Sequence, residues 1–329
     1  METSRLYDVT AAAQVIRSGG LVAFPTETVF GLGADATNSP AVEKIFAAKG
    51  RPSDNPLIVH LSRLDQWPLA ARVLSDSAAK FCRVFAPGPL TVVLPKNERI
   101  CGAVTANRDT VGIRIPSNDV AHQLLEAAAV PIAAPSANMS GRPSCTRWQS
   151  VLEDLDGRID AVLCHNPSTV GLESTVVDCC REPPMVLRTG AISLQELRDI
   201  VPGTEQLEAS AAIGPEADSS FLSPGIRHPH YRPRATVALF VSDLTELDLD
   251  TESAGSLSCC GISIPQIPRG CTHSRIFSSV SDYAMHFYEF LREADRRGAT
   301  LIACQLAPLE GIGIALRDRQ LRAAGQIGG

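Results

Sequence analysis

The spacing of apolar and polar residues predicts helices and strands in turn along residues 9–200. Apolar residues recur at helical spacing in 9–17, and a short apolar run at 21–24 lies between Gly20 and Pro25, as expected of a buried strand. Further helices are predicted at 39–49, 75–86, 119–129 and 193–200, and further strands at 57–61, 90–94, 111–115, 131–134, 160–164, 174–178 and 185–188. Because the two kinds of element alternate without strict order, we expect an α/β fold with a twisted mixed sheet and helices packed on it.

Local signals mark the ends of several predicted helices. Ser39 and Pro40 suit the N-cap and first turn of the helix at 39–49, and Asp119 suits the N-cap of the helix at 119–129. Ser193, with Glu196 three residues later, is typical of a capping box. The stretch 25–33 is rich in hydroxyl groups and glycine, and we predict a loop there.

Residues 203–235 differ in composition from those before them, since Glu, Ala, Ser, Gly and Pro dominate. The end of this segment, at 223–233, combines Pro-Gly turns with His, Arg and Tyr side chains. Beyond it, strands are predicted at 236–241, 259–264 and 301–304, and helices at 282–297 and 311–324. We therefore predict a larger domain at 1–202, a linker at 203–235, and a smaller three-layer, Rossmann-like α/β domain at 236–329.

Composition narrows the class of protein. With 329 residues, 44% of them hydrophobic, the chain is long enough for two domains with buried cores. The formal net charge of −6 means that any binding of phosphate or nucleic acid has to come from a local basic patch. No apolar run reaches the roughly 18 residues of a membrane span, and residues 1–8 do not resemble a secretory signal. The ten cysteines form no C-x-x-C pair, so we expect buried free thiols, no metal site and a cytoplasmic protein that binds no membrane.

The first candidate site combines the stretch 49–56 with a turn further along the chain. Lys49 and Arg51 lie at a predicted helix-to-strand corner, and a point charge beside a planar guanidinium suits a polyphosphate. Ser136 and Asn138, on a proline-flanked turn, can donate further hydrogen bonds to the same oxygens. The alternative for these two pieces is a solvated basic corner and an ordinary Asx/Ser turn.

Other polar residues lie at strand ends or on loops of the first predicted domain. Arg114 lies inside an apolar strand, where a charge is costly unless it meets an anion or forms a structural ion pair. His60 lies near the end of another apolar strand, either as a hydrogen-bonded core residue or as a ligand contact. For Thr28 and Ser174 alone, loop and strand capping is the simpler interpretation, and Arg188 ends a strand. Taken together, they predict phosphate binders and hydrogen-bonding groups for a small molecule on one side of the sheet.

Several nucleotide-binding and catalytic motifs are absent from the sequence. It contains no P-loop, and the glycine pairs at 31–33 and 311–313 lack the third glycine of a dinucleotide fingerprint. It also contains no H-E-x-x-H zinc motif and no G-x-S-x-G nucleophile elbow. These absences argue against a P-loop nucleotidase, a dinucleotide-dependent enzyme and these two kinds of hydrolase.

Five motifs in chain order resemble the YrdC-domain family. They are the stretch 25–33 (PTETVFGLG), the Lys49-x-Arg51 and Ser136-x-Asn138 pair, the stretch 56–60 (PLIVH), the turn 88–91 (GPLT) and the strand 174–178 (STVVD). The linker end at 223–233 (SPGIRHPHYRP) and the tail at 311–325 resemble the long, two-domain form of this family, the threonylcarbamoyl-AMP synthases. The resemblance covers nearly the whole chain. It departs from the family pattern at Phe30, where Tyr is usual, and in the less regular tail motif at 316–321.

The resemblance implies a nucleotidyltransferase that makes L-threonylcarbamoyladenylate and pyrophosphate from ATP, L-threonine and bicarbonate. The product supplies threonylcarbamoyladenosine (t6A) modification of tRNA after hand-over to the tRNA threonylcarbamoyl transferase machinery. Mg²⁺ is implied with ATP, and the linker end at 223–233 is implied as a lid. Lys49 and Arg51 take the catalytic role, and the ATP-binding set is Lys49, Arg51, Asn55, Thr110, Ser136, Asn138, Ser144, Arg188 and Tyr231. The threonine-binding set is Thr28, His60, Arg114, Ala134 and Ser174.

Two alternatives of other classes stay open at this point. The first is an RNA-binding module like the short YrdC proteins, although the acidic net charge argues against RNA binding as the main role. Weak direct binding of tRNA is compatible with either interpretation. The second is a carbamoyl-transfer domain like that of hydrogenase-maturation proteins, which carry zinc-finger-like cysteine motifs and an acylphosphatase-like segment that this sequence lacks.

Overall fold

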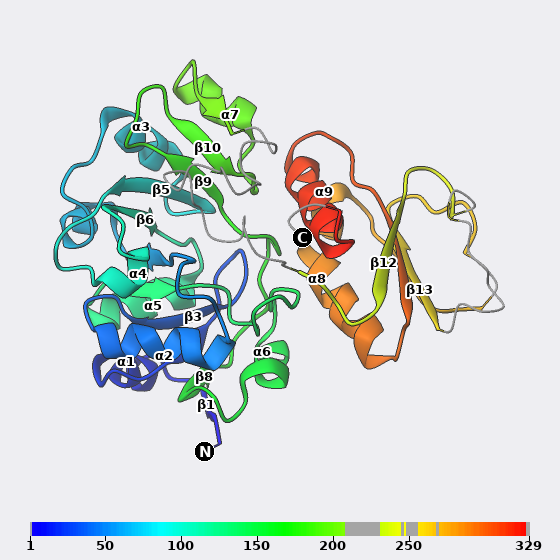
Figure 1. Ribbon diagram of the computed structural model, residues 1–329, viewed down its shortest axis with the longest axis horizontal. Helices are drawn as coiled ribbons and strands as arrows, with labels where there is room; N and C mark the ends of the chain where they lie inside the picture. Colours follow the sequence, from blue (N-terminus) through cyan, green and yellow to red (C-terminus); the bar gives the residue numbers. More distant parts are fainter. Residues whose placement is uncertain (1, 208–230, 245–246, 248–255, 268–269, 327–329) are drawn as a thin grey trace.

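The computed structural model of the chain describes residues 2–207, 231–244, 247, 256–267 and 270–326. These residues form two β-sheets with their helices, and the helices α8 (Val280–Arg296) and α9 (Ile312–Ala323) lie between the sheets (Figure 1). The predicted α/β class, with a larger mixed sheet and a smaller second one, is confirmed. Residues 223–230 of the predicted lid lie outside the described residues, whereas Tyr231 is described.

Within the described residues the first sheet has eleven strands. They are β1 (Ser4–Leu6), β2 (Val22–Phe24), β3 (Gly31–Asp35), β4 (Ile58–His60), β5 (Leu90–Pro95), β6 (Thr110–Arg114), β7 (Ile132–Ala134), β8 (Ala161–Leu163), β9 (Thr175–Asp178), β10 (Met185–Arg188) and β11 (Glu205–Gln206). Their order is β1-β8-β2-β3-β7-β4-β6-β5-β9-β10-β11, and it mixes parallel pairs such as β4–β6 with antiparallel pairs such as β4–β7. The last strand lies within the segment that was predicted as a linker.

Helices cover both faces of this sheet. One face packs against α1 (Val9–Arg17) and α5 (Asp119–Ala128). The other packs against α2 (Ser39–Lys49), α3 (Asp76–Phe85), α4 (Gly102–Thr105), α6 (Trp148–Leu155), α7 (Leu194–Ile200) and the 3-10 helix η1 (Leu64–Leu69). Alternate residues of β7 divide between the faces, because Ile132 and Ala134 belong to the first core and Ala133 to the second.

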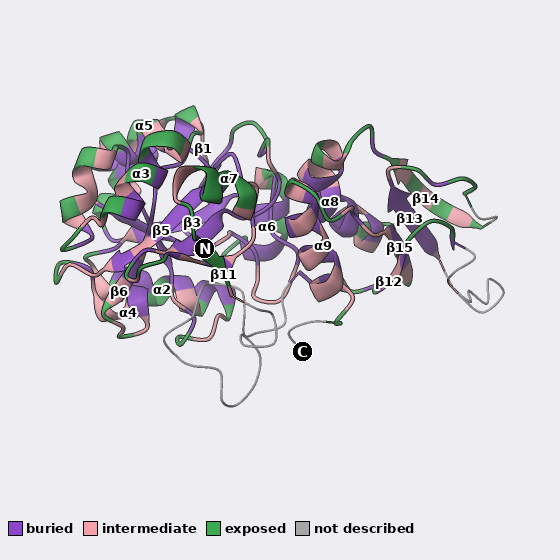
Figure 2. Cartoon of the chain, turned by 90° about the horizontal axis from the view of Figure 1, so that it is seen from above, coloured by how far each residue is buried: buried purple, intermediate pink, exposed green. Residues whose placement is uncertain are grey.

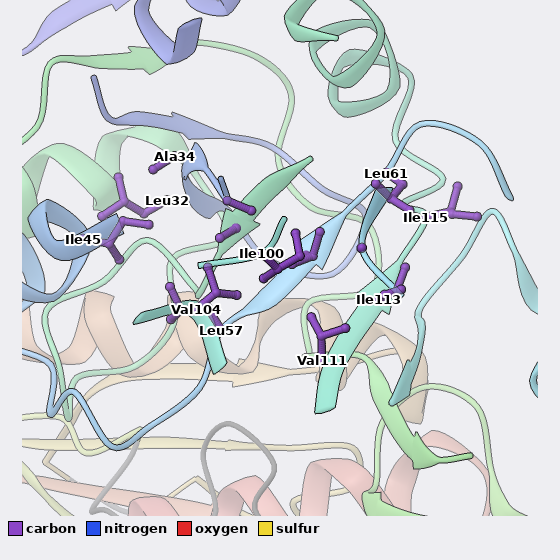
Figure 3. Close-up of a cluster of buried hydrophobic side chains, with 14 of the residues drawn as sticks. Leu32, Ala34, Ile45, Leu57, Leu61, Ile100, Val104, Val111, Ile113 and Ile115 are labelled. Carbon is purple, nitrogen blue, oxygen red and sulfur yellow. The ribbon is translucent and has the colours of Figure 1, made fainter. Parts of the chain in front are cut away.

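The second of these cores surrounds the strands that carry the site. Leu32 on β3, Ile45 on α2, and Val111 and Ile113 on β6 are among its buried members. Figure 3 shows Leu32 beside Ile45, and Val111 and Ile113 further along the same cluster. Figure 2 shows that buried residues concentrate in the sheet, while the outer surfaces of α3 and α5 are exposed. The loops at the strand ends are therefore fixed to a dense apolar layer.

Strand β3 corrects the prediction of a loop at 25–33, because Gly31–Asp35 pairs antiparallel with β2 and β7. Glycine usually weakens a strand, and this composition was the reason for predicting a loop. Here a Cβ on Gly33 would lie 2.8 Å from Ile132 Cγ2 and 2.9 Å from Phe24 Cε1. Glycine is needed in this strand because neighbouring side chains fill the space that a Cβ would take.

Two helix caps are shifted by one residue from the prediction. Asn38, not Ser39, caps α2 by accepting a hydrogen bond from Ala41 N at 3.2 Å, and Asn118, not Asp119, caps α5. In both cases the residue taken as the cap is already helical, and an asparagine oxygen stands directly before it. The capping box at Ser193 is confirmed at the start of α7.

The second sheet is parallel throughout its described strands. These are β12 (Thr236–Phe240), β13 (Leu257–Gly261), β14 (Cys271–Ile276) and β15 (Leu301–Gln305), in the order β12-β15-β13-β14. Strand β13 begins two residues before the predicted stretch 259–264. Among the described residues α8 and α9 share one core on one face of this sheet, whereas three layers were expected.

The cysteine prediction is confirmed, since all ten cysteines are free thiols and only Cys180 is exposed. Among the described residues, no helix has the length and apolar character that a membrane span needs. In the same residues, no three His, Cys, Asp or Glu side chains are grouped so that they could hold a metal ion.

Candidate functional site

A pocket of about 650 Å³, counted with its open mouth, lies in the first sheet where several strands begin or end. The strand register brings its walls together, because His60 on β4 pairs with Arg114 on β6, and Ile58 on β4 pairs with Ala134 on β7. The predicted site residues that line it are Thr28, Arg51, His60, Arg114, Ala134, Ser136, Asn138, Ser174, Arg188 and Tyr231. Residues that are far apart in the sequence, from Thr28 to Tyr231, therefore meet in this pocket.

The other four predicted residues do not line this pocket. Lys49, Asn55 and Ser144 are buried and contact residues that line it. Lys49 donates a hydrogen bond to the carbonyl oxygen of Ser136, the carbonyl oxygen of Asn55 accepts from Arg51 Nε at 3.3 Å, and Ser144 donates to Glu173. Thr110 lines a neighbouring pocket of about 360 Å³, which shares the wall formed by 56–58. The predicted ATP-binding residues are thus divided between one pocket, the layer behind it and the pocket beside it.

Lys49 and Arg51 lie at the helix-to-strand corner that the sequence predicts. Lys49 Nζ donates to the carbonyl oxygens of Ser136, at 2.5 Å, and Asn138. Burial, together with the nearby charge of Arg51, lowers the pKa of Lys49 to about 7. Burial also lowers the pKa of Arg51 to about 10, and the nearby Arg188 adds to this lowering. Lys49 is buried and Arg51 half-buried, and two such cations at close range are costly without an anion, so this corner favours a negatively charged ligand.

The turn after β7 is held by its own side chains. Ser136 Oγ donates to Asn138 Oδ1 at 2.5 Å, and Asn138 Nδ2 donates to the carbonyl oxygens of Met139 and Arg142 at 2.8 and 2.9 Å. Ser140 N donates to the carbonyl oxygen of Lys49 at 2.9 Å, which ties the turn to the end of α2. The two pieces of the first predicted site therefore meet, and the turn is an ordered Asx-type structure as well as a pocket wall.

Arg114 forms the buried ion pair that the sequence left as its alternative. Its Nη2 lies 2.7 Å from Glu27 Oε1, and its Nε donates to the carbonyl oxygen of Gly88 at 3.3 Å. Nη2 and both Glu27 oxygens nevertheless lack hydrogen-bond alignment with any described residue. Because Arg114 also lines the pocket, its guanidinium can align with a ligand carboxylate while Glu27 balances its charge.

His60 is a neutral residue in this environment. Burial, followed by the charge of Arg114, lowers its pKa to about 3. Its Nδ1 lies 3.2 Å from the carbonyl oxygen of Ile58, and its ring meets Phe24 edge-on at 6.0 Å. The side chain is both packed in the core and exposed to the pocket, so the two interpretations from sequence are compatible.

Ser174 and Arg188 form the opposite wall. Arg188 Nη2 donates to the carbonyl oxygen and to Oγ of Ser174 at 3.0 and 3.2 Å, and Ser174 Oγ lies 2.8 Å from Thr91 Oγ1. Burial lowers the pKa of Arg188. These contacts place a third cation, which is half-buried, and a hydroxyl group beside each other at the start of β9.

Sequence reasoning missed Glu173, which lines the pocket next to Ser174. Its Oε1 accepts a hydrogen bond from Ser144 Oγ at 2.6 Å, and its Oε2 accepts from Tyr288 on α8 and Arg319 on α9 at 2.9 and 3.1 Å. Burial opposes its ionisation, but the charges of Arg319 and Arg188 prevail and lower the pKa of Glu173. The only sequence signal was its place directly before the STVVD motif.

Fold and site together define a YrdC-type α/β protein with a pocket that combines arginine side chains with neutral hydrogen-bonding groups. A family model described as "Telomere recombination", which covers Sua5, YciO and YrdC, matches residues 14–190. A second, described as "Threonylcarbamoyl-AMP synthase, C-terminal domain", matches residues 192–325. The chain is 36% identical over 324 residues to the threonylcarbamoyl-AMP synthase of Pyrococcus abyssi, covering 97% of this chain and 94% of the relative. It is 35% identical to that of Bacillus subtilis, covering 96% and 93%.

The chain therefore belongs to the threonylcarbamoyl-AMP synthase family, in its long form. The structure agrees with a crystal structure of P. abyssi Sua5 complexed with L-threonine, with a TM-score of 0.89, 33% sequence identity, and coverage of 98% of this chain and 97% of that one. These matches span both sheets and do not favour the RNA-binding module or the hydrogenase-maturation domain.

Proposed function

We propose that the protein catalyses the formation of L-threonylcarbamoyladenylate and pyrophosphate from ATP, L-threonine and bicarbonate. Membership of the family and the similarity to a threonine-bound relative support the reaction and the amino acid. The observation in this chain that carries the proposal is the set of three neighbouring cations, the buried Lys49 and the half-buried Arg51 and Arg188, whose pKa values burial lowers. A polyphosphate is the ligand best suited to such a set, because its negative charges offset the repulsion between the cations and favour their protonated forms.

The chemistry explains why cations are needed. Threonine's amine and bicarbonate combine to a carbamate with loss of one water molecule. A carbamate oxygen then attacks the α-phosphorus of ATP, and the bond from that phosphorus to the pyrophosphate leaving group breaks. The attacking carbamate and the triphosphate are both anions, so Lys49 and Arg51 lower the barrier by offsetting their repulsion. No covalent link to the protein is required, and positioning is the other main contribution. Mg²⁺ enters as the complex with ATP, and we assign it no protein ligands.

Threonine is proposed to bind on the β4–β6 side of the pocket. Arg114 offers a guanidinium for its carboxylate, and neutral His60 and Ser174 offer hydrogen-bonding groups for its amine and hydroxyl. Thr28 and Ala134 complete this wall. A small polyfunctional ligand is thereby fixed at three points, which places its amine toward the cations.

Some parts of the proposal concern the cell rather than the pocket. The adenylate would pass to the tRNA threonylcarbamoyl transferase machinery for t6A formation, and the protein would act in the cytoplasm. A carbamate loses CO₂ readily in water, so exclusion of solvent from the loaded site is part of the proposal.

The proposal is tested by measuring pyrophosphate release with purified protein, ATP and Mg²⁺. Release should require both threonine and bicarbonate, and the adenylate should be detected by mass spectrometry. Release that is unchanged when threonine or bicarbonate is omitted would identify the protein as a simple nucleotidase and refute the proposal. Serine and allothreonine serve as matched substrates for the threonine subsite.

A further inference from the structure

The helices between the two sheets contact the back of the pocket. Figures 1 and 2 both show α8 and α9 between the first and second sheets. The approach is close, because a Cβ on Gly171 would lie 2.4 Å from Met285 Cα on α8. Two arginines of these helices, Arg292 and Arg319, are buried at 1% and 0% exposure and reach carboxylates of the first sheet's part of the chain. An arginine side chain is buried in such a tightly packed contact only where a carboxylate pairs with its charge.

Arg319 on α9 contacts three parts of the pocket wall at once. Its Nε donates to Glu173 Oε2 at 3.1 Å, and its Nη2 donates to the carbonyl oxygen of Thr189, next to Arg188, at 2.8 Å. Its guanidinium carbon lies 5.7 Å from the ring centroid of Tyr231. A single side chain of the second sheet's helices thus joins β9, β10 and the end of the linker.

Tyr231 is fixed from the same side. Its ring stacks on Tyr288 of α8 with 5.2 Å between centroids, and its backbone has a φ of 66°, in the left-handed region. A non-glycine residue holds this strained conformation only when its surroundings stabilise it. The next residue, Arg232, donates its backbone N–H to the carbonyl oxygen of Gly141 at 2.9 Å. The aromatic stack and this hydrogen bond secure Tyr231 over the pocket.

Arg292 forms a second, parallel support behind the turn after β7. Its two terminal nitrogens donate to Asp154 at 3.2 and 2.8 Å, and Nη2 also donates to the carbonyl oxygen of Pro143 at 2.5 Å. Asp154 in turn accepts from Met139 N at 3.0 Å and from Arg142 Nη1 at 2.5 Å. This support holds the backbone of the turn but does not line the pocket.

We propose that Arg319 is a positioning residue for ATP binding, which neutralises Glu173 and holds Tyr231 and the β10 end in place. This rests on the proposed function, since ATP is taken as the ligand of the pocket. Glu173 lines a pocket that has to accept a triphosphate, and an uncompensated carboxylate there would repel it. Arg319 also lies 2.7 Å from Asp318 through Nη1, but Asp318 has a second partner in Arg322 at 3.0 Å. With Arg319 in place the charge of Glu173 is compensated, so it does not offset the positive charges of Arg51 and Arg188 at the pocket.

The test compares single and double variants in the full-length chain. Arg319→Met should raise the KM for ATP about 10-fold and leave the KM for threonine within about twofold, because the added negative charge lies beside the phosphate binders. Arg319→Met combined with Glu173→Gln should recover most of the lost ATP affinity, since the repelling charge is removed as well. Arg296→Met is the matched control, because Arg296 bridges Glu153 and Glu289 at the same contact but is 41% exposed. It should leave both KM values unchanged.

The recovery in the double variant is the result that a merely structural role would not give. If the double variant is as impaired as Arg319→Met, or if Arg319→Met binds ATP like the Arg296→Met control, the inference is wrong. Should Arg319→Met unfold, Arg319→Gln makes the same comparison, since it removes the charge and keeps a donor for the Thr189 carbonyl. A wild-type protein that binds no ATP would instead refute the proposed function itself.

Discussion

The pKa of Lys49 makes ATP binding depend on pH. Because burial lowers this pKa to about 7, only about one tenth of the empty protein carries a proton on Lys49 at pH 8. A bound triphosphate places several negative charges near Nζ and restores the protonated form. ATP binding should therefore take up about 0.9 proton at pH 8 and about 0.1 proton at pH 6.

The same equilibrium sets the affinity for ATP. The protonated form binds the triphosphate, and its share of the empty protein falls about tenfold per pH unit well above pH 7. Between pH 7.5 and 9 the Kd for ATP should rise about 25-fold. Arg51, with a pKa of about 10, keeps its proton over this range. The triphosphate is already ionised there, so Lys49 is the source of the slope.

Isothermal titration calorimetry with Mg·ATP measures both quantities when it is run in two buffers of different ionisation enthalpy, without threonine or bicarbonate. Lys49→Met should remove the proton uptake and the pH slope. Lys80→Met, which changes an exposed lysine of α3 in the same way, should keep both. An uptake below about 0.2 proton at pH 8, or a slope that survives in Lys49→Met, would refute the reasoning.

Stability of the empty protein gives a second measurement of the same group. The folded pKa of Lys49 lies below its ordinary value of 10.5, so the unfolded chain binds more protons at this residue between pH 7 and that value. The contribution of Lys49 to the free energy of unfolding should therefore rise with pH in this window, by up to about 1.4 kcal/mol per pH unit. Denaturant unfolding at pH 7, 8 and 9 should show the free energy of unfolding of wild type rising relative to that of Lys49→Met as pH rises; a constant difference would contradict the shift.

Three further predictions follow from the pocket and its supports. Arg114→Ala should weaken threonine binding by about 2–5 kcal/mol and ATP binding much less; equal losses in calorimetry would leave the ion pair with Glu27 as its only role. Because the pKa of His60 is lowered to about 3, the threonine Kd should stay level between pH 5 and 7, and a titration near pH 6.5 that vanishes in His60→Gln would contradict this. Gly190→Ala should lower the free energy of unfolding by about 1–3 kcal/mol, since a Cβ there would lie 2.2 Å from Thr175 N; unchanged denaturant midpoints would show that the strand gives way easily.

The elements that the sequence predicted well are those whose residue pattern is explained by a single local effect, either burial or helix capping. The short strand at β2 and the capped helix α7 follow directly from burial and from local hydrogen bonding. Strand β3 was missed because its glycines are required by close packing against Phe24, and the local sequence pattern does not reveal that contact. Helix α6 was missed although Val151 and Leu155 have helical spacing, because the preceding polar run reads as a loop.

The site could be predicted only as far as its own motifs extend. The corner at Lys49 and Arg51 and the polar residues at strand ends, such as Arg114, were singled out from residue types and positions, whereas their assignment to ATP or threonine came from the resemblance. The supports were not predictable, because Arg319 and Glu173 are 146 positions apart and each looks like an ordinary surface charge in sequence. Which of many arginines meets which carboxylate is decided by tertiary packing, and sequence periodicity does not encode it.

The buried charges around the pocket are better explained by ligand binding than by stability. A buried ion pair such as Arg319 with Glu173 contributes no more to folding than well-packed apolar side chains of the same size. Lys49 has carbonyl oxygens as its described partners, and its lowered pKa shows that the empty fold disfavours its charge. A bound anion would reverse this, because its negative charge would favour the protonated form of Lys49 and would attract Arg51. Binding of an anion thus offsets the electrostatic cost of these charges in the empty site. The affinity for the anion depends on Arg319, because Arg319 neutralises Glu173.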